Sequence, residues 1–171
     1  MWVSIPNFSG YEISDQGEVR RIKRAKGTQC KVLKGPLDDR GYRVYVLSDK
    51  SKRKKCSGHS LMGLAFFGGL QPGLEMDHIN GNRSDNRLEN LRLVTHAQNA
   101  WNSKPREGSA SQYKGVSAEP RGKWRAAIRH LGTRRYIGVY NTEEEAARAY
   151  DAAAIELCGE FAYVNFPIGN A

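Results

Sequence analysis

The chain has 171 residues, a net charge of +9 and a sequence pI near 9.6, and this basic excess indicates a polyanionic partner. No apolar stretch is long enough to span a bilayer and no signal-peptide pattern is present, so composition argues against a membrane protein. We therefore expect a soluble, cytoplasmic protein.

The three cysteines, Cys30, Cys56 and Cys158, are odd in number and far apart in the sequence. No CxxC pair is present, so a structural zinc site is not expected. A disulfide framework is not expected either, and the pattern favours free thiols in a reducing compartment.

The N-terminal region carries most of the net charge: residues 1–70 hold 14 Lys and Arg against 6 Asp and Glu, a net of +8. Residues 2–24 alternate in short runs broken by turn residues, which predicts small antiparallel strands. Their apolar positions are expected to form a small core: Trp2, Ile5, Phe8, Tyr11, Ile13 and Val19. Four basic residues follow, and they are either a solvated strand face or phosphate contacts: Arg20, Arg21, Lys23 and Arg24.

Residues 41–48 (GYRVYVLS) alternate clearly and predict the strongest strand of this half. The next segment, residues 49–55 (DKSKRKK), is interpreted as a basic hairpin turn. Its cations are candidates for phosphate contact: Lys52, Arg53, Lys54 and Lys55. Residues 59–67 then show a helical pattern that would cover the strands of the central region.

The central segment, residues 74–102, reads as strand, loop, strand and helix. Residues 74–79 and 91–95 have strand patterns, Asn80-Gly81-Asn82 is a turn signal, and a short helix begins at Thr95 or His96. Asp77 and His78 are adjacent, so on a strand they face opposite sides unless the strand ends there. A carboxylate and an amide oxygen suit Mg²⁺ or Mn²⁺, while a neutral imidazole can accept a proton from water. Together these groups fit metal-assisted hydrolysis of a phosphodiester.

The same segment resembles the HNH endonucleases with a ββα-metal fold, and within them the homing endonucleases. The pattern is DH, about a dozen residues, N-L-R-x-V-T, and a helix carrying Asn. The resemblance implies that Asp77 and Asn99 are metal ligands, that His78 is the general base and that Asn90 ties the loop to the strands. Many family members have histidine where this chain has Asn99, so the site is oxygen-rich and favours Mg²⁺ or Mn²⁺ over zinc. His96 and His59 remain alternatives as helpers of the metal site. Residues 2–20 also resemble a modular motif that often accompanies homing nucleases.

Residues 103–112 (SKPREGSASQ) have the composition of a linker. Three strand-like pieces follow within residues 113–140, and Thr142 with Glu145 forms a capping-box pattern at the start of a helix that ends at Gly159. Residues 113–136 have seven basic residues and one acid, whereas residues 142–160 have six acids and one arginine. The acidic helix would be repelled by DNA, so we expect the basic sheet to be the DNA-binding face.

This region resembles the Apetala/ethylene-response-type DNA-binding domain through Y-K-G-V, G-K-W-R-A-A-I, I-G-V-Y-x-T-x-E-E-A-A-R-A-Y-D and V-N-F-P. The resemblance implies these DNA-facing residues: Lys114, Lys123, Arg125, Arg129, Arg134 and Tyr136. The chain departs from the plant pattern at Ser117, Glu119, Arg121 and Ala127, which leaves its base preference open. Trp124 is equally compatible with a core position and with DNA contact.

We therefore predict an α+β protein in three parts. These are a small antiparallel β module (1–56), a central ββα-metal HNH nuclease (57–103) and, after a linker (104–112), a three-stranded antiparallel sheet packed on one helix (113–167). The predicted function is a site-specific, homing-type DNA endonuclease that acts as a monomer on double-stranded DNA. It would use one divalent metal, need no small-molecule cofactor and leave 5′-phosphate and 3′-hydroxyl ends. The alternatives are a non-catalytic DNA-binding regulator and a general phage or restriction-type nuclease.

Overall fold

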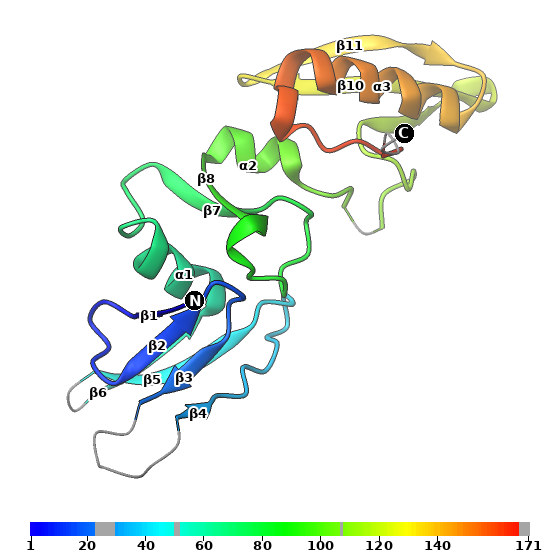
Figure 1. The fold of residues 1–171 in the computed structure, drawn as a ribbon. Helices are drawn as coiled ribbons and strands as arrows, with labels where there is room; N and C mark the ends of the chain where they lie inside the picture. The colour runs from blue at the N-terminus through cyan, green and yellow to red at the C-terminus, as the bar shows by residue number, and fades with distance from the viewer. Residues whose placement is uncertain (23–29, 50–51, 107, 168–171) are drawn as a thin grey trace. The chain divides into compact units, whose positions relative to one another are not determined.

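The computed structural model describes residues 1–22, 30–49, 52–106 and 108–167, which form two compact units, Met1–Thr95 and His96–Ala171 (Figure 1). Each unit has its own hydrophobic core. Small antiparallel sheets and short helices make up both units, so the α+β class predicted from the sequence is confirmed. Among the described residues, no helix is long and apolar enough to cross a membrane.

The first unit begins with a four-stranded antiparallel sheet in the order β1-β2-β3-β4. Its strands are β1 (Trp2–Ser4), β2 (Tyr11–Ser14), β3 (Val19–Arg21) and β4 (Lys31–Val32). Apolar side chains predicted to form the small core are buried here, with Ile13 and Val19 fully enclosed. Trp2 is only half-buried, and the guanidinium of Arg20 lies 4.2 Å from the centroid of its ring.

A two-stranded ribbon follows, made of β5 (Val44–Asp49) and β6 (Lys52–Ser57). Tyr45 and Leu47 of β5 are buried, whereas Val46 is exposed, as the alternating pattern predicts. The prediction of a basic turn over residues 49–55 was wrong, because the cations from Lys52 onward pair with β5 as a strand. Exposed lysines suit this position, since charge on an edge strand discourages pairing with other chains.

Helix α1 (Gly58–Phe66) joins the parts of the first unit into one core, contacting β2, β6 and β7. Leu61 and Met62 are completely buried in a cluster that also contains Ile13 from the N-terminal sheet and Leu91 from the nuclease strands. The segments expected to be a separate N-terminal module and a nuclease therefore share a single core.

The nuclease strands β7 (Leu74–His78) and β8 (Leu91–Thr95) are antiparallel and pair His78 with Leu91. The loop between them contains a single 3₁₀ turn, η1 (Leu88–Asn90). Helix α2 (His96–Asn102) begins at the residue after β8 and belongs to the second unit. Strand, loop, strand and helix thus occur in the predicted order.

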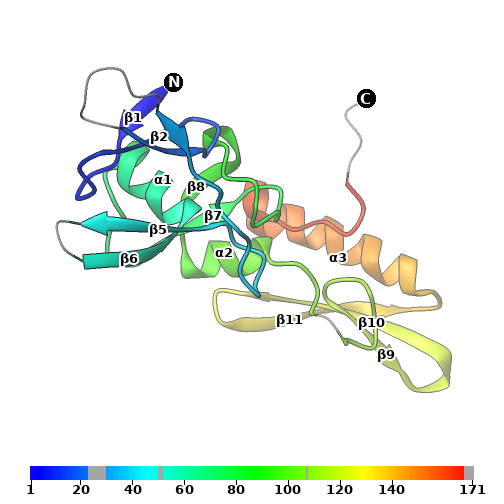
Figure 2. The ribbon, with the colours of Figure 1, turned by 90° about the horizontal axis from the view of Figure 1, so that it is seen from below.

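The second unit contains the predicted sheet and helix. The strands β9 (Val116–Glu119), β10 (Lys123–His130) and β11 (Thr133–Tyr140) are ordered β11-β10-β9, with a 3₁₀ turn η2 (Pro120–Gly122) between the first two. Helix α3 (Glu143–Cys158), followed by η3 (Gly159–Phe161), lies along one face of the sheet (Figure 2). The predicted capping box of Thr142 and Glu145 is present.

Close packing of sheet and helix in this unit depends on small residues. Ala126 of β10 and Ala146 and Ala154 of α3 are almost completely buried at the interface. Gly115 has a φ of +78°, and a Cβ added there would lie 2.0 Å from the ring of Tyr150. Only glycine adopts a positive φ without strain and also leaves room for the Tyr150 ring at this position.

Candidate active site and DNA-binding surface

The candidate base, His78, is the last residue of β7, where the chain leaves the strand for the loop. Asp77 and His78 are each 5% exposed, so both polar side chains are held inside the fold. Burial lowers the pKa of His78 below its usual value, although a hydrogen bond with Asn86 opposes this effect. The imidazole is therefore neutral near pH 7, as a proton acceptor must be.

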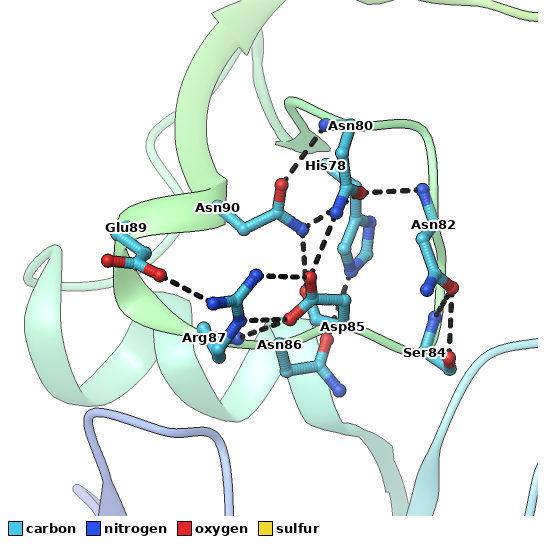
Figure 3. Close-up of polar contacts among 9 residues, drawn as sticks. All are labelled: His78, Asn80, Asn82, Ser84, Asp85, Asn86, Arg87, Glu89 and Asn90. Atoms are coloured by element: carbon cyan, nitrogen blue, oxygen red, sulfur yellow. Dashed lines mark hydrogen bonds and ion pairs between the residues drawn. The ribbon is translucent and has the colours of Figure 1, made fainter.

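Asn86 fixes one edge of this imidazole. Its side-chain oxygen lies 3.0 Å from Nε2 of His78, and the Asn86 side chain is only 3% exposed (Figure 3). With Asn86 accepting this bond, the proton sits on Nε2 and the acceptor lone pair lies on Nδ1. Asn86 was not among the predicted site residues, because a contact across eight residues leaves no periodic signal.

Two glycines from distant parts of the chain make room for Asn86. A Cβ at Gly17, where φ is +75°, would lie 2.6 Å from Cβ of Asn86, and a Cβ at Gly58 would lie 2.4 Å from Nδ2. Within the described residues, that Nδ2 atom is buried without a hydrogen-bond partner. A buried amide with one unsatisfied end costs about 1–3 kcal/mol, which favours a functional reason for keeping it.

Asn90 organises the loop that follows His78 (Figure 3). Its Oδ1 accepts the backbone N–H of Asn80 at 3.0 Å, and its Nδ2 donates to the backbone carbonyl of Asp85 at 2.8 Å. Arg87 forms ion pairs with Asp85 and Glu89, and the guanidinium lowers the pKa of Asp85 to about 2. These bonds hold the loop between the strands in one conformation.

Asp77 contacts the neighbouring strand through an ion pair, in which the Nε of Arg92 donates to Oδ2 of Asp77 at 3.0 Å. This arginine was part of the recognised motif, but sequence reasoning gave it no role. Because Arg92 is itself only 15% exposed, the pair holds the carboxylate in place on β7. The second candidate ligand, Asn99, lies on α2. A carboxylate and an amide oxygen are the ligand types that suit Mg²⁺ or Mn²⁺.

His59 lies at the start of α1 beside His78, with ring centroids 5.5 Å apart. Tyr42 covers the His59 ring at 4.8 Å, and the hydroxyl of Ser57 lies 3.1 Å from its Nε2. Burial, with a smaller effect from His78, lowers the pKa of His59 to about 4. A neutral His59 thus forms one wall of the imidazole site.

The N-terminal cations differ in how they are held. The Nε of Arg20 donates to Glu12 at 2.7 Å, so its charge is largely compensated within the sheet. Arg21 is exposed, as are the four basic residues of β6: Lys52, Arg53, Lys54 and Lys55. Lys23 and Arg24 lie outside the described residues.

The C-terminal sheet gathers most of its predicted DNA-facing residues on one face. Trp124, Ala126 and Ile128 pack toward the α3 core, so the residues between them on β10 face the other way. A bulge in the β10 and β11 pairing places Val139 opposite Arg125 and Tyr136 opposite Ala127. The face opposite α3 therefore carries Lys123, Arg125, Arg129, Arg134 and Tyr136. Arg125 also pairs with Glu119 at 3.1 Å.

Lys114 is placed differently from these residues. Its Nζ donates to the backbone carbonyls of Ala100 at 3.1 Å and Trp101 at 2.6 Å, near the end of α2. Burial lowers the pKa of Lys114 to about 8. Because the ammonium is directed to protein carbonyls, we leave Lys114 out of the DNA-facing set implied by the resemblance.

Three family models match successive parts of this chain. Residues 1–48 match the NUMOD4 motif, residues 58–101 the HNH endonuclease family and residues 111–160 the AP2 domain. Successive segments of the chain are thus similar to a NUMOD4 motif, an HNH endonuclease domain and an AP2 domain. The HNH match includes Asp77, His78, Asn90 and Asn99, and the AP2 match includes β9 to β11 and α3.

The similar proteins are of two different kinds, endonucleases and a plant protein with an AP2/ERF domain. DNA endonuclease I-HmuI of Bacillus phage SP01 is 35% identical over 106 residues, covering 61% of this chain and 58% of its own length. An uncharacterised HNH endonuclease of Acanthamoeba polyphaga mimivirus is 36% identical, covering 60% and 52% respectively. An AP2/ERF and B3 domain-containing protein of Oryza sativa is 42% identical over 84 residues, covering 47% and 23%. The chain thus spans less than two thirds of each of these relatives.

A solved structure is also similar. The match is to a structure of the HNH homing endonuclease I-HmuI that describes DNA binding and cleavage. Its TM-score is 0.51 and its sequence identity to this chain is 33%. The match covers 58% of this chain and 55% of that chain. The fold likeness therefore agrees with the sequence match to the HNH domain.

Proposed function

We propose that this protein is a DNA endonuclease of the homing type that hydrolyses phosphodiester bonds with His78 as general base. The observation that carries the proposal is the bond between Asn86 and Nε2 of His78, inside a segment that matches the HNH family. A buried, neutral and oriented imidazole is what proton abstraction from water near pH 7 requires.

In the proposed mechanism, each side chain has one task. Asn86 holds the proton on Nε2, so Nδ1 of His78 accepts the proton from the attacking water. Asn90 fixes the loop and thereby the position of His78 at the end of β7. Water attacks phosphorus, the bond to the 3′ oxygen breaks, and a solvent water protonates the departing oxygen, which leaves 5′-phosphate and 3′-hydroxyl ends.

HNH nucleases generally use a divalent metal, and we propose Mg²⁺ or Mn²⁺ for this chain. Asp77 and Asn99 would hold the ion. When bound, the ion would supply positive charge beside the scissile phosphate and its departing oxygen. Arg92 keeps the Asp77 carboxylate oriented on β7.

Double-stranded DNA is the proposed substrate, and the exposed cations indicate how it is held. The sheet face opposite α3 would read the target, while Arg21 and the basic residues of β6 would contact phosphates without regard to sequence. Because one chain supplies both a nuclease motif and a DNA-binding domain, we propose that it acts as a monomer. Sedimentation of the complex with a single target duplex tests this assembly.

The decisive experiment is single-turnover cleavage by His78→Ala. Loss of a positioned base lowers the rate by about 10²- to 10⁴-fold, whereas DNA affinity should stay within twofold of wild type. A variant that cleaves at the wild-type rate would remove His78 from the mechanism. If wild type binds one target tightly but never cleaves it with Mg²⁺ or Mn²⁺, the protein is instead a DNA-binding regulator, as AP2 relatives named transcription factors would suggest.

A further inference from the structure

Helix α2 belongs by sequence to the nuclease but is packed into the AP2 domain. The HNH match extends to residue 101, yet the compact C-terminal unit begins at His96. The Trp101 ring packs against the core formed by β10 and α3, and it stacks on His130 with centroids 4.9 Å apart and planes 25° apart.

Hydrogen bonds from the AP2 domain also reach the C-terminal end of α2. Besides its bonds to Ala100 and Trp101, the Nζ of Lys114 lies 3.4 Å from Oγ of Ser103. The backbone N–H of Tyr163 donates to the carbonyl of Trp101 at 3.1 Å. Two donors from separate segments of the C-terminal unit thus bind carbonyls that a helix end leaves without an intrahelical partner.

Such outside support matters because α2 has little stability of its own. It contains seven residues, none of them buried, and no basic residue lies in its last turn. An isolated helix this short is not stable in water, and its C-terminal end favours a nearby positive charge. Lys114 supplies that charge from the other side of the linker.

We propose that the AP2 domain is a working part of the nuclease, in which Lys114 and Trp101 position α2 and with it the metal ligand Asn99. This inference rests on the proposed function, since it takes Asn99 as a ligand. Lys114 and Trp101 are positioning residues, and their loss changes metal affinity and the cleavage step more than DNA affinity.

The test compares Lys114→Met with Lys104→Met in the full chain. Lys104 is an exposed lysine that follows α2, and its replacement removes the same charge without touching the helix carbonyls. Three quantities are measured: the single-turnover rate at saturating DNA, the Mn²⁺ affinity by electron paramagnetic resonance, and hydrogen exchange of the α2 amides. Trp101→Ala provides a second, independent removal of the support.

We expect Lys114→Met to weaken Mn²⁺ binding and to slow cleavage by about tenfold, the effect typical of groups that orient metal ligands. Exchange of the α2 amides should accelerate, while DNA affinity should equal that of Lys104→Met. Identical rates, Mn²⁺ affinities and exchange in the two lysine variants overturn the proposal. Faster exchange with unchanged rate and Mn²⁺ affinity also overturns it, because α2 would then be supported without serving the site.

A separate control tests the proposed function itself. Asp77→Ala should abolish Mn²⁺ binding in a chain whose α2 exchange is unchanged. If wild type and Asp77→Ala bind Mn²⁺ equally, the metal site is wrongly assigned and the role of α2 in it falls with that assignment. If only wild type binds Mn²⁺, the metal site is correctly assigned, and the difference between the two lysine variants then tests only whether Lys114 positions α2.

Discussion

The side-chain oxygen of Asn86 lies 3.0 Å from Nε2 of His78, and both residues are buried. The bond fixes the tautomer and the orientation of the candidate base at the same time. It comes from a residue of the loop rather than from either strand, so the loop conformation directly determines the reactive edge of the imidazole.

Replacing Asn86 with alanine should therefore slow cleavage without weakening DNA binding. We expect a decrease of roughly 10- to 100-fold, smaller than the loss of about 10²- to 10⁴-fold from removing a base altogether. Asn86→Asp keeps an acceptor for Nε2 and should retain more activity. A rate for Asn86→Ala equal to that of the wild type would show that the bond does not matter for cleavage.

Metal dependence should follow the two proposed ligands. Asp77→Ala and Asn99→Ala should each lose at least about 10²-fold in rate, and chelation should stop the wild-type reaction, because phosphate charge would go unneutralised. The measurement is cleavage of a supercoiled plasmid over a range of Mg²⁺ concentrations. His96→Ala is the comparison on the same helix; if it is inactive while Asn99→Ala cleaves, His96 is the helix ligand.

Target discrimination should depend on the sheet face opposite α3. Arg129 and Arg134 are cross-strand partners on this face, and both are exposed. Replacing either with alanine should cost about 1–3 kcal/mol if it contacts a base, with relaxed preference at one position. A phosphate contact would instead lower the salt dependence of binding by roughly one ion. Selection of cleaved sites from a random library distinguishes these outcomes, and an unchanged site preference for both variants would contradict reading by this face.

Acid should destabilise the first unit through His59. Burial in the folded chain lowers the pKa of this histidine to about 4 from the usual 6.5, with smaller effects from the neighbouring His78 and Asp38. The unfolded chain therefore binds more protons between these values, and stability falls as pH decreases from about 6.5 toward 4, by about 2–3 kcal/mol. Urea unfolding at pH 7 and pH 4.5 measures this difference. His59→Asn should reduce the pH dependence, and an unchanged difference would assign acid sensitivity to other groups.

The sequence was most informative where local rules suffice. Thr142 and Glu145 form their capping box because a cap depends only on residues three apart. The strands around His78 followed from alternation, and the fold class followed from the order of such elements. By contrast, the basic segment from Lys52 has the composition of a turn, and only its pairing with β5 identifies it as a strand.

Contacts between distant segments were not accessible from the sequence. Asn86 acquires its role from Gly17 and Gly58, which lie 69 and 28 residues earlier in the numbering. Lys114 was assigned to DNA because its neighbours match an AP2 pattern, yet its ammonium reaches the end of α2. In both cases the deciding partner lies in a distant segment of the sequence, where neither periodicity nor motif spacing applies.

The two glycines that enclose Asn86 also affect how such proteins evolve. Gly17 lies in the segment matching the NUMOD4 motif, Gly58 in the HNH domain, and a side chain at either would displace the amide that holds His78. A gene fusion that brought in a new N-terminal segment without a glycine at that position would misplace the base, even if the new segment bound DNA well. Only an N-terminal module that carries a glycine at the position of Gly17 can therefore replace the present one without displacing Asn86.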